Sequence, residues 1–331
     1  MDTLTHGLLG AALAALPLPR RLEASATTPF RASLLVSVLA AELPDLDYLL
    51  PAEDTVLHTL SAHRGYSHCL LAIPLVALAA TLLTRAFFRR AAFAALFARA
   101  LLCVPLAHLL PDLWTGWGTR LFLPFSERRL ALDWTMVIDP LFTAPLALAA
   151  LAAAFKLARL RPAMAIGAGA ATLYVVLRVA SSAQLTREVS RAYPSALSVQ
   201  VFPALLGVTR WRYVVRLGSE YAAGSVALGQ KPREAARHAV NDTALADFIV
   251  RAPTVREALS WARFPVVRSA PLDDGATRVS IADLRYHLNG SPTLTFVIDV
   301  DRAGVVKNAR LDRGGSPSEL LKRLRQGPGS F

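Results

Sequence analysis

Long uncharged runs rich in alanine and leucine fill residues 1–185 of this 331-residue chain, and they limit its fold more than any other feature. The whole chain has a mean hydropathy of +0.40, with 54% hydrophobic and 18% charged residues. Typical globular chains hold about 45–50% apolar and about 25% charged residues. Because about 20 apolar residues in a helix span the ~30 Å hydrocarbon core of a bilayer, the first part of the chain predicts a helical membrane domain.

We expect six hydrophobic segments in this part. They cover residues 3–18, 32–50, 66–83, 91–110, 136–157 and 163–177. The first is short, the second is interrupted by residues 42–47, and the fourth contains Arg99. A cleaved signal peptide, ending near residues 24–26, is the rival interpretation of the first segment. The acidic Asp2 stands where such a peptide carries basic residues, so we favour a retained segment.

After residue 185, alternating patterns and turns replace the long apolar runs. Strands are predicted at 211–217 and 221–228, which form a hairpin, and at 277–281, 294–300 and 305–311. Helices are predicted at 233–239, 243–250 and 255–263, and a frayed end from residue 314. The predicted fold class is therefore mainly α: a polytopic helical membrane domain over 1–185, followed by a small soluble α+β domain over 186–331.

The chain is strongly basic, with a net charge of +12. Many of its arginines lie in short turns between apolar runs, a pattern typical of membrane topology. The basic residues are not interleaved with aromatic ones as in single-strand nucleic-acid binders, so we expect a lipid bilayer and no nucleic acid as partner. Cys69 and Cys103 each lie alone in an apolar run, which argues against a disulfide scaffold or a thiolate metal site.

Metal-capable side chains gather at particular ends of the six segments. If every segment crosses the membrane, odd-numbered segments start, and even-numbered segments end, at the same face. The residues at those ends are His6, Asp45, Asp47, His63, His68, His108, Asp112 and Asp133. We therefore expect them to form one cluster at one membrane face.

The distribution of basic residues predicts which face this is. The opposite face carries Arg20, Arg21, Arg31, Arg85, Arg89, Arg90, Lys156, Arg159 and Arg161, and the cluster face carries Arg64, Arg120, Arg128 and Arg129. Cytoplasmic loops carry the excess of Lys and Arg. This pattern predicts that the opposite face is cytoplasmic, and that the cluster and the C-terminal domain lie on the periplasmic or outer side.

The spacing of the cluster residues favours a metal site. His108 and Asp112 are four residues apart and share a helix face. Residues 63–68 place His63 and His68 around a glycine turn, and residues 42–47 supply three carboxylates. An Asp at membrane depth costs about 2.5–3.5 kcal/mol unless it is paired, hydrated or ligating. Mixed His/Asp ligation suits zinc, manganese or iron.

These observations predict a membrane-embedded hydrolase that depends on one or two divalent ions, most simply zinc. The predicted ligands are His6, Asp45, Asp47, His68, His108 and Asp112. His63 is predicted as a ligand or proton shuttle, and Arg64 as a clamp for an anionic group. A metal-activated water would attack a phosphoester or related bond, and the depth of the cluster suggests a lipid or lipid-linked substrate.

Other interpretations remain open at this point. Asp45 or Asp47 alone could cap a helix, and His108 with Asp112 could be a hydrogen-bonded pair. A non-catalytic membrane or envelope stress protein with a structural metal is the main alternative to an enzyme. A metal transporter is disfavoured because no polar path crosses the third to sixth segments. The isolated His58, His238 and His287 are predicted to be structural.

Four motifs in order resemble the YdjM-like family, described as membrane-bound, metal-dependent hydrolases of the bacterial inner membrane. They are residues 1–7 (Met-Asp-Thr-Leu-Thr-His-Gly), 42–47 (Glu-Leu-Pro-Asp-Leu-Asp), 63–68 (His-Arg-Gly-Tyr-Ser-His) and 108–112 (His-Leu-Leu-Pro-Asp). Residues 116–125 and the pair Asp139-Pro140 also resemble the family, and residues 264–267 and 282–286 resemble a C-terminal extension of some members.

That family is in turn distantly similar to the zinc phospholipase C and single-strand nuclease superfamily. The resemblance implies a main site of His108, Asp112, His68 and Asp45 or Asp47, with His6 and Asp112 available to a second ion. The later His/Glu set that would complete a third site has no counterpart here, so a three-zinc mechanism is not expected.

Overall fold

The structure is a computed structural model that describes residues 1–17, 28–49, 54–204, 207–240 and 247–312. The chain divides into two compact units. The first comprises Met1–Leu50 and His63–Ala180, and the second comprises Pro51–Ala62 and Ser181–Phe331. The predicted cleavage site at residues 24–26 and the predicted frayed end from residue 314 lie outside the described residues.

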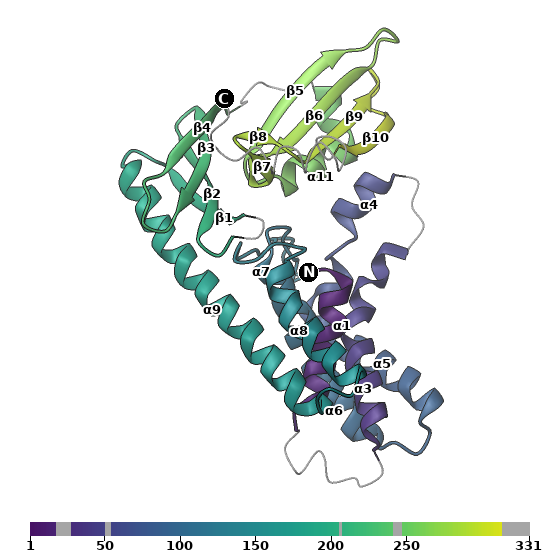
Figure 1. Cartoon of the computed structure of the whole chain (residues 1–331). Helices are drawn as coiled ribbons and strands as arrows, with labels where there is room; N and C mark the ends of the chain where they lie inside the picture. The colour runs from purple at the N-terminus through teal and green to yellow at the C-terminus, as the bar shows by residue number, and fades with distance from the viewer. Residues whose placement is uncertain (18–27, 50–53, 205–206, 241–246, 313–331) are drawn as a thin grey trace. The chain divides into compact units, whose positions relative to one another are not determined.

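The first unit is helical, and Figure 1 shows most of its helices running side by side as a bundle. Its helices are α1 (Thr3–Ala15), α3 (Phe30–Glu42), α5 (Ile73–Phe87), α6 (Phe93–Cys103), α7 (Leu110–Trp114), α8 (Pro140–Ala154) and the first part of α9 (Leu160–Ala192). Short helical turns join them: η1 (Leu43–Leu49), η2 (Tyr66–His68), η3 (Leu70–Ala72) and the π-helical η4 (Val104–Leu109).

Three continuous helical stretches of the described residues are long and apolar enough to cross a membrane: Leu70–Phe87, Phe93–Trp114 and Leu160–Ala192. Each of the six predicted segments contains a helix, but α1, α3 and α8 have only 13, 13 and 15 residues. At 1.5 Å per residue, 13 residues cover only about 20 Å. A helical N-terminal part with several candidate spans is confirmed, whereas the length of a full span is found in three segments.

Small residues allow α1 and α3 to pack closely. A Cβ atom added to Gly10 would lie 2.7 Å from the carbonyl oxygen of Ser37, so a larger side chain would push the two helices apart. Close approach of helix backbones at small residues is typical of helix packing in membranes. This contact fixes His6 on α1 relative to the end of α3, where the acidic motif begins.

Arg99 is the charged residue inside the fourth predicted segment, and its side chain caps the C-terminal end of α1. Its Nη1 donates to the carbonyl oxygens of Leu13 and Leu16 at 2.9 and 3.2 Å. Carbonyls in the last turn of a helix lack the usual i+4 donor, and the Leu13 carbonyl also accepts from the backbone nitrogen of Leu16 at 3.2 Å. At the other end, the Asp2 carboxylate accepts from the backbone nitrogen of Thr5 at 3.0 Å. Both ends of this short helix are therefore capped.

The second unit is rich in β-sheet. One antiparallel sheet has the order β1-β2-β3-β4, with β1 (Ser198–Pro203), β2 (Arg210–Leu217), β3 (Glu220–Ala227) and β4 (Arg233–Ala239). The other has the order β10-β9-β6-β5, with β5 (Pro265–Pro271), β6 (Thr277–Asp283), β9 (Thr295–Val300) and β10 (Val306–Asp312). The short strands β7 (His287–Leu288) and β8 (Ser291–Pro292) pair, after the turn η5 (Leu284–Tyr286). The helices are α4 (Thr55–Ser61), α10 (Asp247–Arg251) and α11 (Pro253–Trp261).

The central strands β2 and β3 of the first sheet are largely buried, whereas the edge strand β4 is mostly exposed. Trp211, Tyr213 and Val215 alternate along β2 and pack with Leu185 and Val189 of the last turns of α9. The intervening Val214 points to the other face and packs in a cluster with Phe202, Phe264 and Leu284. Alternate side chains of β2 therefore pack into two different hydrophobic cores, one on each face of the sheet.

Several predicted elements of this unit are confirmed and one is wrong. The hairpin and the strands near 277–281, 294–300 and 305–311 correspond to β2–β3, β6, β9 and β10, and 255–263 overlaps α11. Residues 233–239 form β4, not a helix, because pairing with β3 from Ser225 to Glu220 outweighs a local preference of their sequence. Of the helix predicted at 243–250, the structure describes the residues from Asp247 onward, which form α10.

The helix α4 belongs to the second unit although its sequence lies between two motifs of the first. Its N-cap Asp54 accepts from the backbone nitrogen of Leu57 at 2.8 Å and from the hydroxyl of Thr254 on α11. Val56 and Leu60 are buried, and α4 packs against α11 and β10. The next residue but one after α4 is His63.

Candidate metal centre

His108 and Asp112 lie where the helix of the fourth segment changes its winding. His108 is on the π-helical turn η4, and Asp112 is on α7, which follows it directly. Pro105 in η4 has no backbone N–H to donate to the preceding turn, which favours a local break in the α-helical hydrogen bonds. Such π-helical turns frequently occur at functional sites. Both side chains are fully buried.

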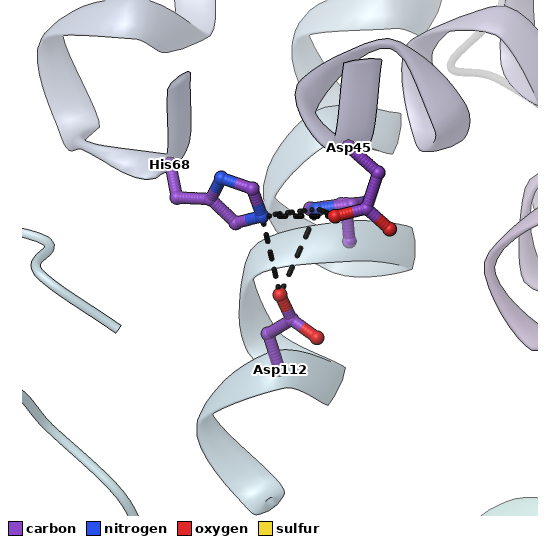
Figure 2. Close-up of side chains that lie close together, drawn as sticks. Asp45, His68 and Asp112 are labelled. Carbon is purple, nitrogen blue, oxygen red and sulfur yellow. Dashed lines mark hydrogen bonds and ion pairs between the residues drawn. The ribbon is translucent and has the colours of Figure 1, made fainter. Parts of the chain in front are cut away.

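Four side chains from four elements converge here: Asp45 of η1, His68 of η2, His108 of η4 and Asp112 of α7. One ligand atom of each lies within 4.8 Å of all the others. Figure 2 shows Asp45, His68 and Asp112 pointing toward one another. His68 Nε2 lies 2.9 Å from His108 Nε2, 3.3 Å from Asp45 Oδ1 and 3.4 Å from Asp112 Oδ2.

The separations between these atoms match the size of a metal coordination shell. His108 Nε2 lies 3.6 Å from Asp45 Oδ1 and 3.7 Å from Asp112 Oδ2. A tetrahedron of ligands about 2.0–2.2 Å from its centre, as around zinc, has edges of about 3.3–3.6 Å. Five of the six edges here, from 2.9 to 3.7 Å, are therefore close to those of a bound ion.

Hydrogen bonds behind the imidazoles fix which nitrogen carries the proton. His108 Nδ1 lies 2.6 Å from the carbonyl oxygen of Ala41, which can only accept, so this nitrogen donates. Ser67 Oγ donates to Asp47 Oδ2 at 2.6 Å and therefore accepts from His68 Nδ1 at 2.8 Å. In the neutral imidazoles both Nε2 atoms are then free of hydrogen and face the cluster.

The atoms that face one another in this centre are thus all hydrogen-bond acceptors, with no donor from the described residues between them. Two bare imidazole nitrogens and two carboxylate oxygens approach one another in a buried site. Among the described residues, Asp112 Oδ2 has no hydrogen-bond partner. Buried acceptors require compensation, and a cation at their centre would satisfy all four at once. The residues present therefore fit a divalent metal ion.

His6 lies beside this group. Its ring stacks on that of His108 with centroids 4.0 Å apart, and its Nδ1 lies 2.8 Å from the carbonyl oxygen of Ala107. Its Nε2 is 3.3 Å from Asp112 Oδ1 and has no hydrogen-bond partner among the described residues. The α-amino group of Met1 contacts the same carboxylate oxygen. His6 therefore contacts two members of the four-residue group, His108 and Asp112, without belonging to it.

A second group of possible ligands consists of Asp47, His63 and His68. His63 Nδ1 lies 3.0 Å from Asp47 Oδ1, and the Tyr48 ring packs on the His63 ring with centroids 3.8 Å apart. Burial lowers the pKa of His63 below its usual value, although hydrogen bonding to Asp47 opposes this shift. Because Asp47 also contacts His68 through Ser67, this group can act as a support for the first.

Arg64 faces inward. Its backbone has φ +56°, a left-handed conformation that is uncommon for residues other than glycine. Nη2 contacts Asp112 Oδ1 at 2.7 Å, and Nη1 donates to Thr115 Oγ1 at 2.7 Å. The side chain is buried. This geometry favours a role in holding Asp112 over the predicted clamp for an anionic group.

The six predicted ligands lie together with His63 and Arg64, although His6 and Arg64 contact Asp112 without belonging to either group. Asp133 was predicted for the same cluster, but neither it nor the other candidates belong to these groups. Glu42, Asp133, His58, His238 and His287 are absent from both groups formed by the described residues. Sequence reasoning missed Ser67 and Thr115, which hold His68 and Arg64, and the carbonyls of Ala41 and Ala107. Ser67 lies inside the 63–68 motif and could have been suspected, whereas a backbone carbonyl leaves no trace in the sequence.

Comparisons with known proteins identify the family of the N-terminal part of the chain. The chain is 27% identical over 140 residues to "Uncharacterized protein YfhP" of Bacillus subtilis (strain 168), and the match covers 42% of each chain. No solved structure matches the chain. Residues 1–185, more than half of the chain, match the YdjM inner membrane protein family. This match includes every residue of the metal centre, and the chain therefore belongs to the YdjM inner membrane protein family.

Proposed function

We propose that this protein is a membrane-embedded, divalent-metal-dependent hydrolase of phosphoester or related bonds. The observation that carries the proposal is the set of Asp45, His68, His108 and Asp112, whose facing atoms are all acceptors at separations suited to one ion. When bound, a divalent ion supplies a Lewis acid and acidifies a coordinated water.

Zinc is the metal that we favour, with manganese or iron as alternatives. Two imidazoles and two carboxylates suit each of these ions. The separations support an ion held by the four-residue group, and His6 with Asp112 could assist a second one. A single ion is the simpler assignment because the guanidinium of Arg64 already contacts the Asp112 oxygen that faces His6.

The residues around the ligands have separate roles in this proposal. Ser67 and Asp47 orient His68, and Arg64 orients Asp112, as partners behind metal ligands commonly do. His63, paired with Asp47, is the candidate to take or give a proton during hydrolysis. It is buried yet directly beside the partly exposed η1, so a proton has a short way to solvent.

We further propose that the centre and the C-terminal part lie on the periplasmic or outer side of the inner membrane. The support is the excess of basic residues at the opposite ends of the helices, nine against four in the loops assigned to each face. The family is one of inner membrane proteins, which supports the compartment but not the orientation.

A non-catalytic protein with a structural metal is the second candidate. Four protein ligands can complete a tetrahedral shell, whereas a catalytic site keeps a position open for water or substrate. In the described structure Asp45 is the partly exposed member of the set, at 12%, while the other three side chains are fully buried. An open position would therefore lie beside Asp45.

Two measurements on the detergent-purified protein test the proposal. Metal content should be close to one ion per chain in the wild type and in His58→Ala, and should be lost in His68→Ala. His58 is the matched control because it lies on α4, outside both groups. Hydrolysis of a chromogenic phosphodiester should follow metal content. Bound metal without turnover of any phosphoester would support the structural alternative, and no metal after reloading would refute both.

A further inference from the structure

We infer that an apolar rim beside the metal centre is immersed in the interfacial layer of the bilayer, and that the substrate is an amphiphile with an anionic phosphoester head and a hydrocarbon chain. The rim consists of Leu46, Tyr48, Leu49, Tyr66, Phe122 and Phe125. The occupant of this surface is lipid. The statement about substrate rests on the proposed function, but the statement about lipid contact does not.

The rim residues are large and exposed. Phe125, Leu49 and Tyr66 expose 85%, 76% and 68% of their surface, and the remaining three expose about half. They lie on η1, on η2 and on the turn formed by residues 121–125. Contiguous exposed apolar side chains on a protein mark a binding surface, since water contact with them is unfavourable. These six therefore need a covering partner.

Hydrogen bonds hold the three parts of the rim next to one another. The backbone nitrogen of Arg120 donates to the carbonyl oxygen of Arg64 at 3.0 Å, and that of Leu70 donates to Leu121 at 3.0 Å. The turn at residues 121–125 is thus attached to the segment that carries Tyr66. On the other side, Tyr48 packs on His63, three residues before Tyr66.

Lipid is favoured as the covering partner because the rim continues the surface of a candidate membrane span. The span Leu70–Phe87 starts four residues after Tyr66. Its first residues Leu70, Leu71 and Leu75 are also exposed, at 46%, 56% and 68%. Tyrosines at the ends of membrane helices typically sit at the level of the headgroups. The exposed Arg128 follows Phe125 closely, as a residue that contacts lipid phosphate would.

Three rim residues, Leu46, Tyr48 and Leu49, lie on the same turn, η1, as the most accessible residue of the centre. Asp45 is the partly exposed ligand, and Leu46 follows it directly. Tyr48 and Leu49 extend the same turn. We therefore expect a group that approaches Asp45 from outside to meet exposed apolar side chains of η1. A polar, fully hydrated substrate gains nothing from them, whereas the chain of an amphiphile would be bound by them as its head reaches the ion.

Site-directed spin labels test the position of the rim in nanodiscs of phosphatidylethanolamine and phosphatidylglycerol. Labels are placed one at a time at Leu49→Cys and Phe125→Cys in a Cys69→Ser/Cys103→Ala background that still binds metal. Leu75→Cys on α5 is the lipid-facing control, and Asp273→Cys in the second unit is the aqueous control. We expect the rim labels to match Leu75→Cys, with high access to oxygen and low access to a nickel chelate.

Two results would overturn the lipid contact. Rim labels that match Asp273→Cys would place the rim in water. Low access to both reagents would mean that protein covers it, from this chain or a second copy.

A separate assay tests the substrate class. One phosphodiester head is offered with a short and with a long alkyl chain, and the long-chain ester should be preferred in kcat/KM. Leu49→Ser should lower that preference by about tenfold. A preference that is absent, or unchanged in the variant, refutes the inferred substrate while the hydrolase stands. Absence of any turnover with lipid-exposed rim labels refutes the proposed function while the lipid contact stands.

Discussion

Arg64 lies outside the four-residue group, yet its contacts position one member of that group, Asp112. Its guanidinium binds Asp112 and Thr115 at the same time, and its backbone nitrogen donates to Asp47 Oδ2 at 3.3 Å. It therefore connects the two groups of possible ligands. The left-handed backbone at this position is maintained by those contacts and not by a glycine. The planar fork of arginine is the feature that this geometry uses.

Replacing Arg64 by lysine should weaken metal binding while keeping the charge. Lysine cannot hold Asp112 and Thr115 together, and loss of a partner behind a ligand typically costs about 10–100-fold in metal affinity. The dissociation constant for zinc, measured by competition with a chelator, should rise by such a factor in Arg64→Lys. Arg216→Lys, at an exposed position of β2, should leave the dissociation constant unchanged. An unchanged constant in Arg64→Lys would contradict the positioning role.

His287 gives the second unit a defined response to acid. Burial, reinforced by the positive charge of Arg212, lowers the pKa of His287 to about 3. Its Nδ1 accepts from the backbone nitrogen of Gly290 at 3.2 Å, which requires the unprotonated form. In the unfolded chain the histidine titrates near pH ~6.5. Below pH ~6.5 the unfolded state therefore binds a proton that the folded state does not bind. The contribution of His287 to the free energy of unfolding is full above that pH and is lost as the pH falls toward 3.

This contribution predicts a measurable pH dependence. Between pH 7 and pH 5 the free energy of unfolding should fall by about 2 kcal/mol more in the wild type than in His287→Gln, at about 1.4 kcal/mol per pH unit below the unfolded pKa. Denaturant titrations followed by the fluorescence of the buried Trp211 and Trp261 would measure it. His58→Gln is the control and should behave as the wild type. Equal pH dependence in the wild type and His287→Gln would refute this assignment.

At the scale of elements, α1 depends on the helix beside it. It is too short to cross the hydrocarbon core, and the carbonyls at its C-terminal end accept hydrogen bonds from Arg99 of α6. A charged residue in an apolar helix is costly unless its donors are used, and here they replace the missing partners of a helix terminus. The hydrogen bonds to the end of α1 therefore offset the cost of burying the charge of Arg99, and they stabilise the end of α1.

Removal of this cap should destabilise the first unit. Arg99→Met keeps much of the side-chain volume but removes the charged donor to the carbonyls of Leu13 and Leu16. Hydrogen bonds to a charged group contribute about 1.5–3 kcal/mol. The thermal unfolding temperature in detergent should therefore fall in Arg99→Met and less in Arg99→Lys. Arg159→Met, at an exposed position, is the control. A wild-type unfolding temperature for Arg99→Met would show that other groups satisfy these carbonyls.

Sequence patterns could predict the elements that depend on local composition. Segment ends and the i, i+4 spacing of His108 and Asp112 were enough to expect a cluster at one end of the helices. They could not reveal that His108 lies on a π-helical turn, or that Ala41 fixes its proton, because both depend on where the backbone of another segment lies. The strand β4 escaped prediction for the same reason, since its partner β3 decides its conformation.

At the scale of the whole molecule, α4 links the metal centre to the second unit. Asp47 precedes α4 and His63 follows it, and the two form a hydrogen bond of 3.0 Å within the first unit. Between them, α4 is held by Thr254 and packs on α11. The ends of α4 are thus covalently joined to one group of possible ligands, while its side chains belong to another core.

This connection predicts that the second unit responds to metal. Since coupling between two sites is reciprocal, metal binding should slow hydrogen exchange at residues 55–61 and 253–261. Mass spectrometry of peptides from metal-loaded and metal-free protein would show it, with β5 as the reference segment that should not change. In His68→Ala the difference should vanish. Equal exchange of α4 with and without metal in the wild type would mean that the units act independently.

The interleaved course of the chain also bears on how such a protein could lose or gain its C-terminal part. A deletion of everything after residue 185 would leave the YdjM-matching portion intact in sequence. It would nevertheless strip α4 of α11 and β10 and open Val56 and Leu60 to water. We therefore expect a family member without this extension to carry a more polar segment between its acidic and histidine motifs. The amphipathic character of that one short segment is a marker by which the two architectures can be told apart in a sequence.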